Sequence, residues 1–146
     1  MFAEYPKTVV LNDGAHVVLR TMMAGDADAV ARLLDGDPGT GAAVVVAVEG
    51  ERTAGVARLT IDGDAGRVAV ALDPAYRGRR LGTWMLLDAV HLASGLGVAR
   101  LEASASPEDA ERCAALRRLD FVVDPARSSA SELVCVKALH AAWPNF

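Results

Sequence analysis

The sequence has little cysteine and no apolar run long enough to cross a membrane. Among its 146 residues only Cys113 and Cys135 are cysteines. Neither has a Cys or His neighbour at metal-ligand spacing, so we expect two reduced, buried thiols and no metal site. Hydrophobic residues make up 52% of the chain, yet no run approaches the roughly 20 apolar residues that a membrane-spanning helix needs. Residues 1–7 lack the basic and apolar segments of a signal peptide, so we expect a cytoplasmic protein with no membrane partner.

Lysine is also scarce, and the positive charge is unevenly placed. Of the 15 basic residues, 13 are arginine, and 19 acidic residues give a net charge of −4. This balance argues against a protein that binds nucleic acid through its charge alone. Three arginines, Arg77, Arg79 and Arg80, nevertheless fall within four positions. The sequence therefore predicts a local anion site in an acidic protein.

Hydrophobic patterns predict a mixed α/β (α+β) fold. Strands are predicted at residues 8–11, 16–20, 42–48, 54–61, 67–72, 98–105, 121–123 and 132–138, and helices at 26–35, 80–94 and 107–119. We expect the last helix to be capped by Ser106 and to join two strands that form a parallel pair. A chain of this length fits one core, so residues 1–146 are interpreted as one domain.

The segment with the most chemical information is residues 72–83, between a predicted strand and an almost wholly apolar helix. A turn that enters a helix presents unpaired N–H groups and the positive end of the helix dipole, which together favour a phosphate or pyrophosphate. Gly78 and Gly82 permit close approach of backbone to a ligand, and the arginines add charge. The segment thus indicates a site for an anionic nucleotide.

This segment resembles the signature of the GNAT superfamily of acyl-CoA-dependent N-acyltransferases, Gln/Arg-x-x-Gly/Ala-x-Gly/Ala. Arg77 stands at its first position and Gly82 at its last, while Arg80 replaces the small middle residue. The resemblance continues in residues 106–121, where Asp109 stands at the family's Asn position and Asp120 at its Gly position. It covers roughly residues 8–138 and is nearest to bacterial protein-lysine acetyltransferase domains.

The resemblance implies a mostly antiparallel sheet, splayed between its central strands, flanked by three to four helices and holding acetyl-CoA or another acyl-CoA in the gap. The backbone of Val70, Ala71 and Leu72 would meet the pantetheine arm. The remaining implied cofactor residues are Arg77, Gly78, Arg79, Arg80, Leu81, Gly82, Thr83 and Asp109. The implied reaction moves an acetyl group to a primary amine, on a protein lysine or on a small molecule.

Two residues that relatives use for proton transfer are replaced in this chain. Arg67 stands where lysine-acetylating relatives often carry a Glu base, and Leu116 stands where many members carry a Tyr acid. Glu102, Ser104 and Ser106 alternate along one face of a strand predicted to border the gap. Glu102 is therefore the candidate general base, although a solvated or helix-covered strand face explains the same pattern.

Two further interpretations stay open at this point. The first is a catalytically silent GNAT-fold module that binds acyl-CoA or a partner protein. The second is an interaction domain without a nucleotide ligand, in which Arg80 fills the loop. Residues 22–41 leave room for one helix where relatives usually have two, so a shallow acceptor cleft is expected. The last strand and the apolar tail make a homodimer plausible.

Overall fold

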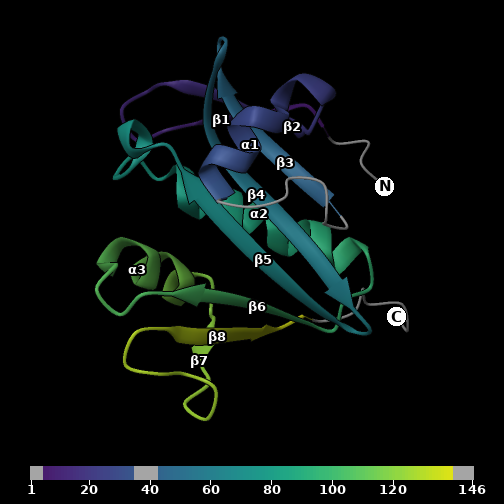
Figure 1. The fold of residues 1–146 in the computed structure, drawn as a ribbon, viewed down its shortest axis with the longest axis vertical. Helices are drawn as coiled ribbons and strands as arrows, with labels where there is room; N and C mark the ends of the chain where they lie inside the picture. Colours follow the sequence, from purple (N-terminus) through teal and green to yellow (C-terminus); the bar gives the residue numbers. More distant parts are fainter. Residues whose placement is uncertain (1–4, 35–42, 140–146) are drawn as a thin grey trace.

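The computed structural model describes residues 5–34 and 43–139. Its strands are β1 (Lys7–Val10), β2 (His16–Thr21), β3 (Ala43–Glu49), β4 (Arg52–Asp62), β5 (Ala65–Leu72), β6 (Arg100–Ala105), β7 (Val122–Val123) and β8 (Leu133–Ala138). Its α-helices are α1 (Ala27–Leu34), α2 (Leu81–Gly95) and α3 (Ala110–Arg118), and the 3-10 turns are η1 (Ala24–Asp26) and η2 (Pro74–Tyr76) (Figure 1). The element order and the mixed fold class predicted from the sequence are confirmed.

All eight strands form one sheet in the order β1-β2-β3-β4-β5-β6-β8-β7. Every neighbouring pair is antiparallel except β5 and β6. The predicted parallel pairing of β6 with β7 is wrong, because β8 returns between them and pairs with both. A two-residue strand offers few ladder bonds, so β7 completes the outer edge of β8 instead of a central position.

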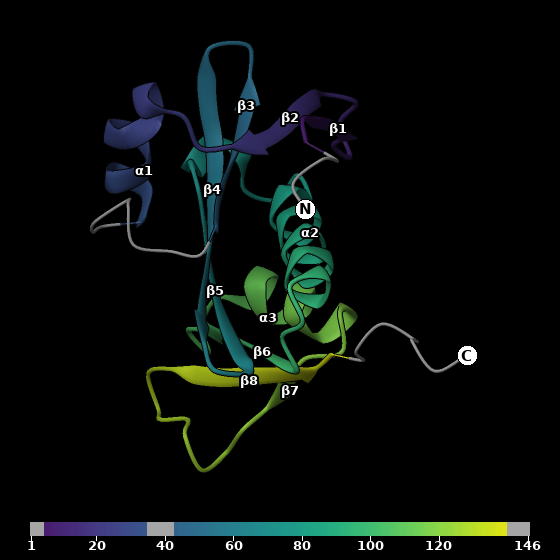
Figure 2. The ribbon, with the colours of Figure 1, turned by 90° about the vertical axis from the view of Figure 1, so that its right-hand side faces the viewer.

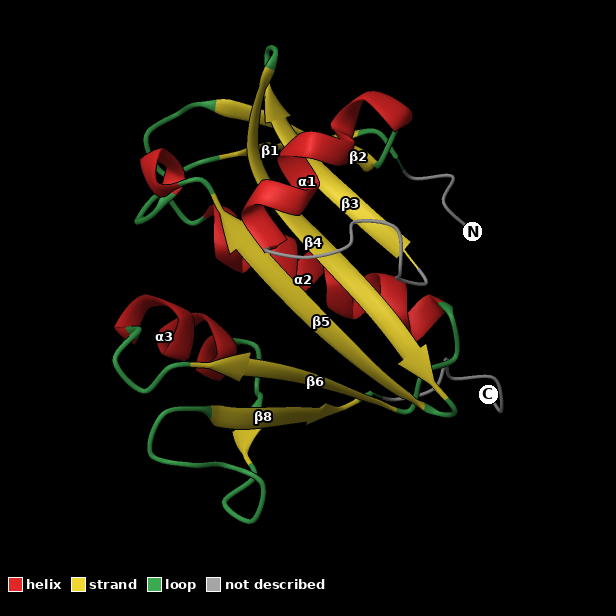
Figure 3. Ribbon diagram, viewed as in Figure 1, coloured by secondary structure: helices red, strands yellow, loops and turns green. Residues whose placement is uncertain are grey.

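Helices cover both faces of the sheet (Figures 2 and 3). Helix α1 lies on one face, where Val30 packs with Val46 and Val56 in a small cluster. Helices α2 and α3 lie on the other face. Because α2 is apolar on most sides, it is buried against β4 and β5 and carries the centre of the main core, including Leu81 and Met85. Within the described part of the chain, no helix has the length and apolar content to span a membrane.

The parallel strands β5 and β6 pair over only four residues, which are half of β5 and two thirds of β6. Their register runs from Ala65 opposite Arg100 to Val68 opposite Ala103. Beyond Val68, β5 continues alongside β4 as far as Leu72, while β6 continues alongside β8. The two strands therefore diverge, and the last residues of β5 keep an edge that no strand occupies. This is the splay that the family resemblance implied.

The start of α3 differs from the prediction. The helix begins at Ala110, and Asp109 is its N-cap, with a carboxylate oxygen that accepts the Arg112 N–H at 3.0 Å. Ser106 instead closes a short turn, in which its hydroxyl accepts the Glu108 N–H at 3.3 Å. Asp109 displaces Ser106 as the cap because residues 106–109 form that turn before the helix starts. The predicted end of the first helix at Asp35, and the apolar tail beyond residue 139, lie outside the described residues.

Candidate active site

The loop that follows β5 is held rigidly by contacts on both sides. Asp73 accepts the Ala75 N–H at 2.9 Å, which caps η2, and this bond lowers the pKa of its carboxyl group with help from the nearby Arg52 guanidinium. The Tyr76 ring is buried, and its hydroxyl donates to Glu49 at 2.5 Å. The guanidinium of Arg79 lies 4.7 Å from the centre of the same ring. The loop thus enters α2 in a fixed geometry.

The N-terminus of α2 has no side-chain cap. Its N-cap residue is Arg80, which adopts a left-handed backbone with a φ of 73° and makes no capping hydrogen bond. Gly78 has the same φ of 73°, which glycine adopts without steric cost. The first N–H groups of an α-helix have no partner within the helix, and here no side chain of the cap supplies one. This end of α2 therefore suits an anionic group.

A cavity of about 60 Å³ lies where β5, α2 and α3 meet. Six predicted cofactor residues line it: Val70, Leu72, Arg77, Gly82, Thr83 and Asp109. The other five do not: Ala71, Gly78, Arg79, Arg80 and Leu81. Among these, Leu81 is a fully buried core residue, Arg79 forms an ion pair with Asp13 at 2.7 Å, and Arg80 is exposed. The expectation that Arg80 fills the loop is therefore wrong.

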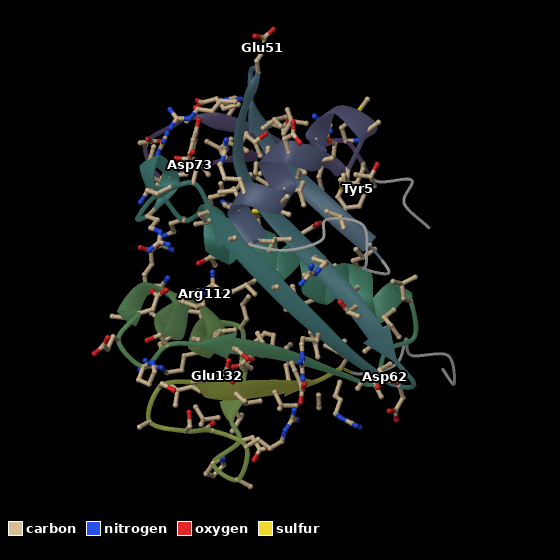
Figure 4. All side chains as sticks on the ribbon, viewed as in Figure 1. Tyr5, Glu51, Asp62, Asp73, Arg112 and Glu132 are labelled. Atoms are coloured by element: carbon tan, nitrogen blue, oxygen red, sulfur yellow. The ribbon has the colours of Figure 1, made fainter. Side chains whose placement is uncertain are left out.

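Sequence reasoning missed four residues of the cavity wall: Leu86, Glu111, Arg112 and Ala115. Three of them belong to α3, and a signal for them was present. Residues three apart lie on one face of a helix, so the placement of Asp109 at the site points to Arg112 as its neighbour on the same face. Figure 4 shows Arg112 between α3 and β5.

Arg112 extends from α3 into the gap beside β5. Its Nη2 donates to the carbonyl oxygen of Val70, on the edge of β5 that no strand occupies. Burial lowers the pKa of its guanidinium, and the positive charge of Arg77 acts in the same direction. Next to it, Glu111 accepts the Gly78 N–H at 2.9 Å. The site thus contains a cation beside β5 and an anion beside the loop.

Glu102 lies on the other face of the sheet from α2 and α3, and two arginines bind it. The Arg67 guanidinium is 3.2 Å from one carboxylate oxygen, and Arg127, from the loop between β7 and β8, forms an ion pair with the other. Both ion pairs favour the charged carboxylate and oppose uptake of a proton. Leu116, at the position where relatives carry a tyrosine, is buried in the core.

A second, more open hollow of about 610 Å³ lies beside α1 and the turn between β3 and β4. Seven of its twelve lining residues are charged, and two ion pairs, Arg20 with Asp26 and Arg52 with Asp73, connect four of them. Because these charges neutralise each other, the hollow resembles a solvated surface. In residues 5–34 and 43–139, no group of three or more His, Cys, Asp or Glu side chains is arranged to hold a metal.

A mixed sheet that opens between a parallel pair, beside an uncapped helix N-terminus, defines the acyltransferase class that the sequence resembles. The sequence model of the acetyltransferase (GNAT) family matches residues 18–121. The chain therefore belongs to this family, and acyl transfer from an acyl-CoA is its general chemistry. A search of curated protein sequences finds no match.

Solved structures share the fold at low sequence identity. The GNAT domain of PAT from S. lividans has a TM-score of 0.77 and 17% identity, over 94% of this chain and 98% of that one. The ribosomal-protein-S18-alanine N-acetyltransferase from Escherichia coli has a TM-score of 0.73 and 15% identity, over 89% and 98%. A Bacillus subtilis acetyltransferase in complex with CoA has a TM-score of 0.69 and 15% identity, over 84% and 98%. At this level of identity, the likeness shows the fold alone.

Proposed function

We propose that residues 1–146 form one N-acetyltransferase domain that moves an acetyl group from acetyl-CoA to a primary amine, of a protein lysine or of a small molecule. The observation that carries the proposal is the cavity between β5, α2 and α3, which opens beside the uncapped N-terminus of α2. Arg77, Gly82 and Thr83 would hold the pyrophosphate there, and the free edge of β5 at Val70 and Leu72 would pair with the pantetheine arm.

The reaction is direct attack within a ternary complex. The amine nitrogen attacks the thioester carbonyl, the carbon–sulfur bond breaks, and the thiolate of CoA leaves and takes up a proton. A lysine-type amine has a pKa of about 10.4 and must lose a proton before it attacks. Orientation of the two reactants supplies a large part of the acceleration, and water carries the proton away where no side chain accepts it.

Glu102 is the candidate general base, but its two ion pairs oppose its protonation. To accept a proton, the carboxylate must lose the advantage of two guanidinium partners, Arg67 and Arg127. Glu102→Gln separates the two roles: a base is lost with this change and the rate falls by about 100-fold or more. If Glu102 only forms ion pairs that stabilise the fold, the rate of acetyl transfer is unchanged and only the free energy of unfolding falls.

The alternative is a catalytically silent module that binds acyl-CoA or a partner protein. Arg67 and Leu116, at the two positions where relatives carry a base and an acid, favour this alternative. The distinction is turnover, measured as release of CoA with lysine peptides, polyamines and aminoglycosides as acceptors. Release with any one acceptor identifies an enzyme, whereas saturable binding without release from the whole panel supports the silent module.

Calorimetry with acetyl-CoA and with CoA tests the site itself. Arg77→Ala removes a positive charge from the proposed phosphate site. Gly82→Trp places a large side chain where the backbone would approach the ligand. We expect micromolar binding by the wild type and its loss in both variants. Arg100→Ala is a matched control, because this exposed arginine pairs only loosely with Asp64, at 3.6 Å, and does not line the cavity. Absence of binding by the wild type would refute the proposed function.

A further inference from the structure

Two consecutive residues of α3 contact the two parts of the proposed cofactor site. The Glu111 carboxylate accepts the N–H of Gly78, in the loop that would hold phosphates. The Arg112 guanidinium donates to the carbonyl of Val70, on the strand edge that would hold the pantetheine arm. One residue is an anion and the other is an N–H donor. Their order along α3 follows the order of phosphate and amide in CoA.

Arg112 occupies the place of a ligand group. The Val70 carbonyl lies beyond Val68, where pairing with β6 has ended, and a buried carbonyl needs a donor. Arg112 supplies this donor, at the expense of taking its charge out of water beside Arg77. With its side chain in place, the cavity measures about 60 Å³, whereas small-molecule sites usually span about 300–1,000 Å³. A pantetheine arm can therefore enter only if Arg112 leaves.

Glu111 acts in the same way at the loop. Its carboxylate oxygen, 2.9 Å from the Gly78 nitrogen, makes the contact that a phosphate oxygen would make. It lies beside the positive end of α2, which favours any anion placed there. An incoming pyrophosphate must break this hydrogen bond and is repelled by the same carboxylate. Glu111 thus competes with the phosphates, and Arg112 competes with the arm.

We propose that Glu111 and Arg112 occupy the contacts of the cofactor when it is not bound, and that each lowers the affinity for one part of it. Glu111 competes with the phosphates, and Arg112 competes with the pantetheine arm. This inference rests on the proposed acyl-CoA site and adds two specificity-determining residues to it. A ligand with both phosphates and arm displaces both contacts, and its phosphates can then meet the released Arg112. A ligand with the arm alone must displace a guanidinium and gains no phosphate contact in return. The site therefore selects against carriers that lack phosphates.

The test measures binding of two probes, acetyl-CoA and S-acetylpantetheine, which carries the arm without phosphates. Calorimetry is performed on the full chain with wild type, Glu111→Ala, Arg112→Ala and Arg112→Met, the last of which keeps an unbranched apolar side chain but removes the guanidinium. Two exposed residues of matching charge serve as controls, Glu132→Ala and Arg118→Ala. Thermal unfolding of each variant establishes that it is folded.

We expect a separation of effects between the two probes. Arg112→Ala and Arg112→Met should bind S-acetylpantetheine about tenfold more tightly than the wild type, the size of one charged hydrogen bond. Glu111→Ala should bind acetyl-CoA about threefold more tightly and S-acetylpantetheine unchanged, as loss of one exposed like charge predicts. If the wild type binds acetyl-CoA and these variants differ no more than their controls, the inference is overturned. A wild type that does not bind acetyl-CoA overturns the proposed function itself.

Discussion

Replacement of Arg80 by glycine should stabilise the protein. Arg80 has a φ of 73°, a left-handed conformation that costs a residue with a side chain about 1–2 kcal/mol. Glycine avoids this strain, but its greater freedom in the unfolded chain offsets about 0.5–1 kcal/mol of the gain. The side chain of Arg80 is exposed and caps nothing, so little else is lost. The net increase in the free energy of unfolding is about 0.5–1 kcal/mol, or about 1–4 °C in melting temperature.

The assay is urea unfolding, followed by circular dichroism, of Arg80→Gly and Arg80→Ala. Alanine keeps the strained backbone, so we expect it to be less stable than glycine at this position by about 1 kcal/mol. At Arg117, an exposed position in the last turn of α3, the order should reverse, because glycine is less favourable than alanine in a helix by up to about 1 kcal/mol. If alanine is at least as stable as glycine at position 80, the strain argument is refuted.

Two further predictions concern packing and pH. A Cβ at Gly55 would lie 2.8 Å from a methyl carbon of Leu72 and 3.2 Å from a backbone oxygen. Gly55→Ala should therefore lower the free energy of unfolding by about 1–3 kcal/mol and displace Leu72 from the cavity wall. A urea unfolding curve that matches the wild type would contradict this. The hydrogen bond from Arg20 lowers the pKa of Asp26, with help from the Met23 N–H and against the effect of burial. Because the pKa of Asp26 is lower in the folded state, its ionised carboxylate stabilises the fold at pH values above the unfolded-state pKa near 3.8. This stabilisation is lost as the pH falls through the pKa of the folded state. Asp26→Asn should therefore cost about 1–2 kcal/mol at pH 7, and the difference should shrink below about pH 4 in unfolding curves; a difference independent of pH would exclude the ion pair as its cause.

Local patterns predicted most of the fold because each element carries its own signal. The strands predicted at residues 8–11 and 16–20, those between residues 42 and 72, and the apolar helix after Arg80 follow from neighbours in the sequence. The position of β8 does not, since pairing between distant strands is decided by the whole sheet. The prediction of Ser106 as the cap of α3 is wrong for a similar reason. A serine before a proline is a favourable N-cap by its local sequence, but in the folded chain residues 106–109 form a turn, in which Ser106 accepts the Glu108 N–H.

The candidate site was predictable in one half only. The loop and strand residues were accessible through the family resemblance, whose motif lies in one continuous stretch. Arg112 could be found only through its spacing of three residues from Asp109, and its contact with Val70, 42 positions away, has no local signal. Arg127 binds Glu102, 25 positions away. Because charged side chains this long are usually solvated, nothing in the sequence context of Arg127 marks it as a partner of Glu102.

The two faces of the sheet beside the gap between β5 and β6 carry different arrangements of charge, one suited to binding an anion and the other poorly suited to proton transfer. On the side of α2 and α3, Arg77 and the uncapped helix end offer positive charge to an anionic ligand, and Arg112 is a further cation that such a ligand can meet. On the other face, the one buried carboxylate of β6 among the described residues, Glu102, is already neutralised by two arginines. A site built in this way holds a charged cofactor more readily than it moves a proton. A change at Glu102 should therefore lower turnover of an amine without lowering the affinity for acyl-CoA, whereas a change at Arg77 should lower that affinity.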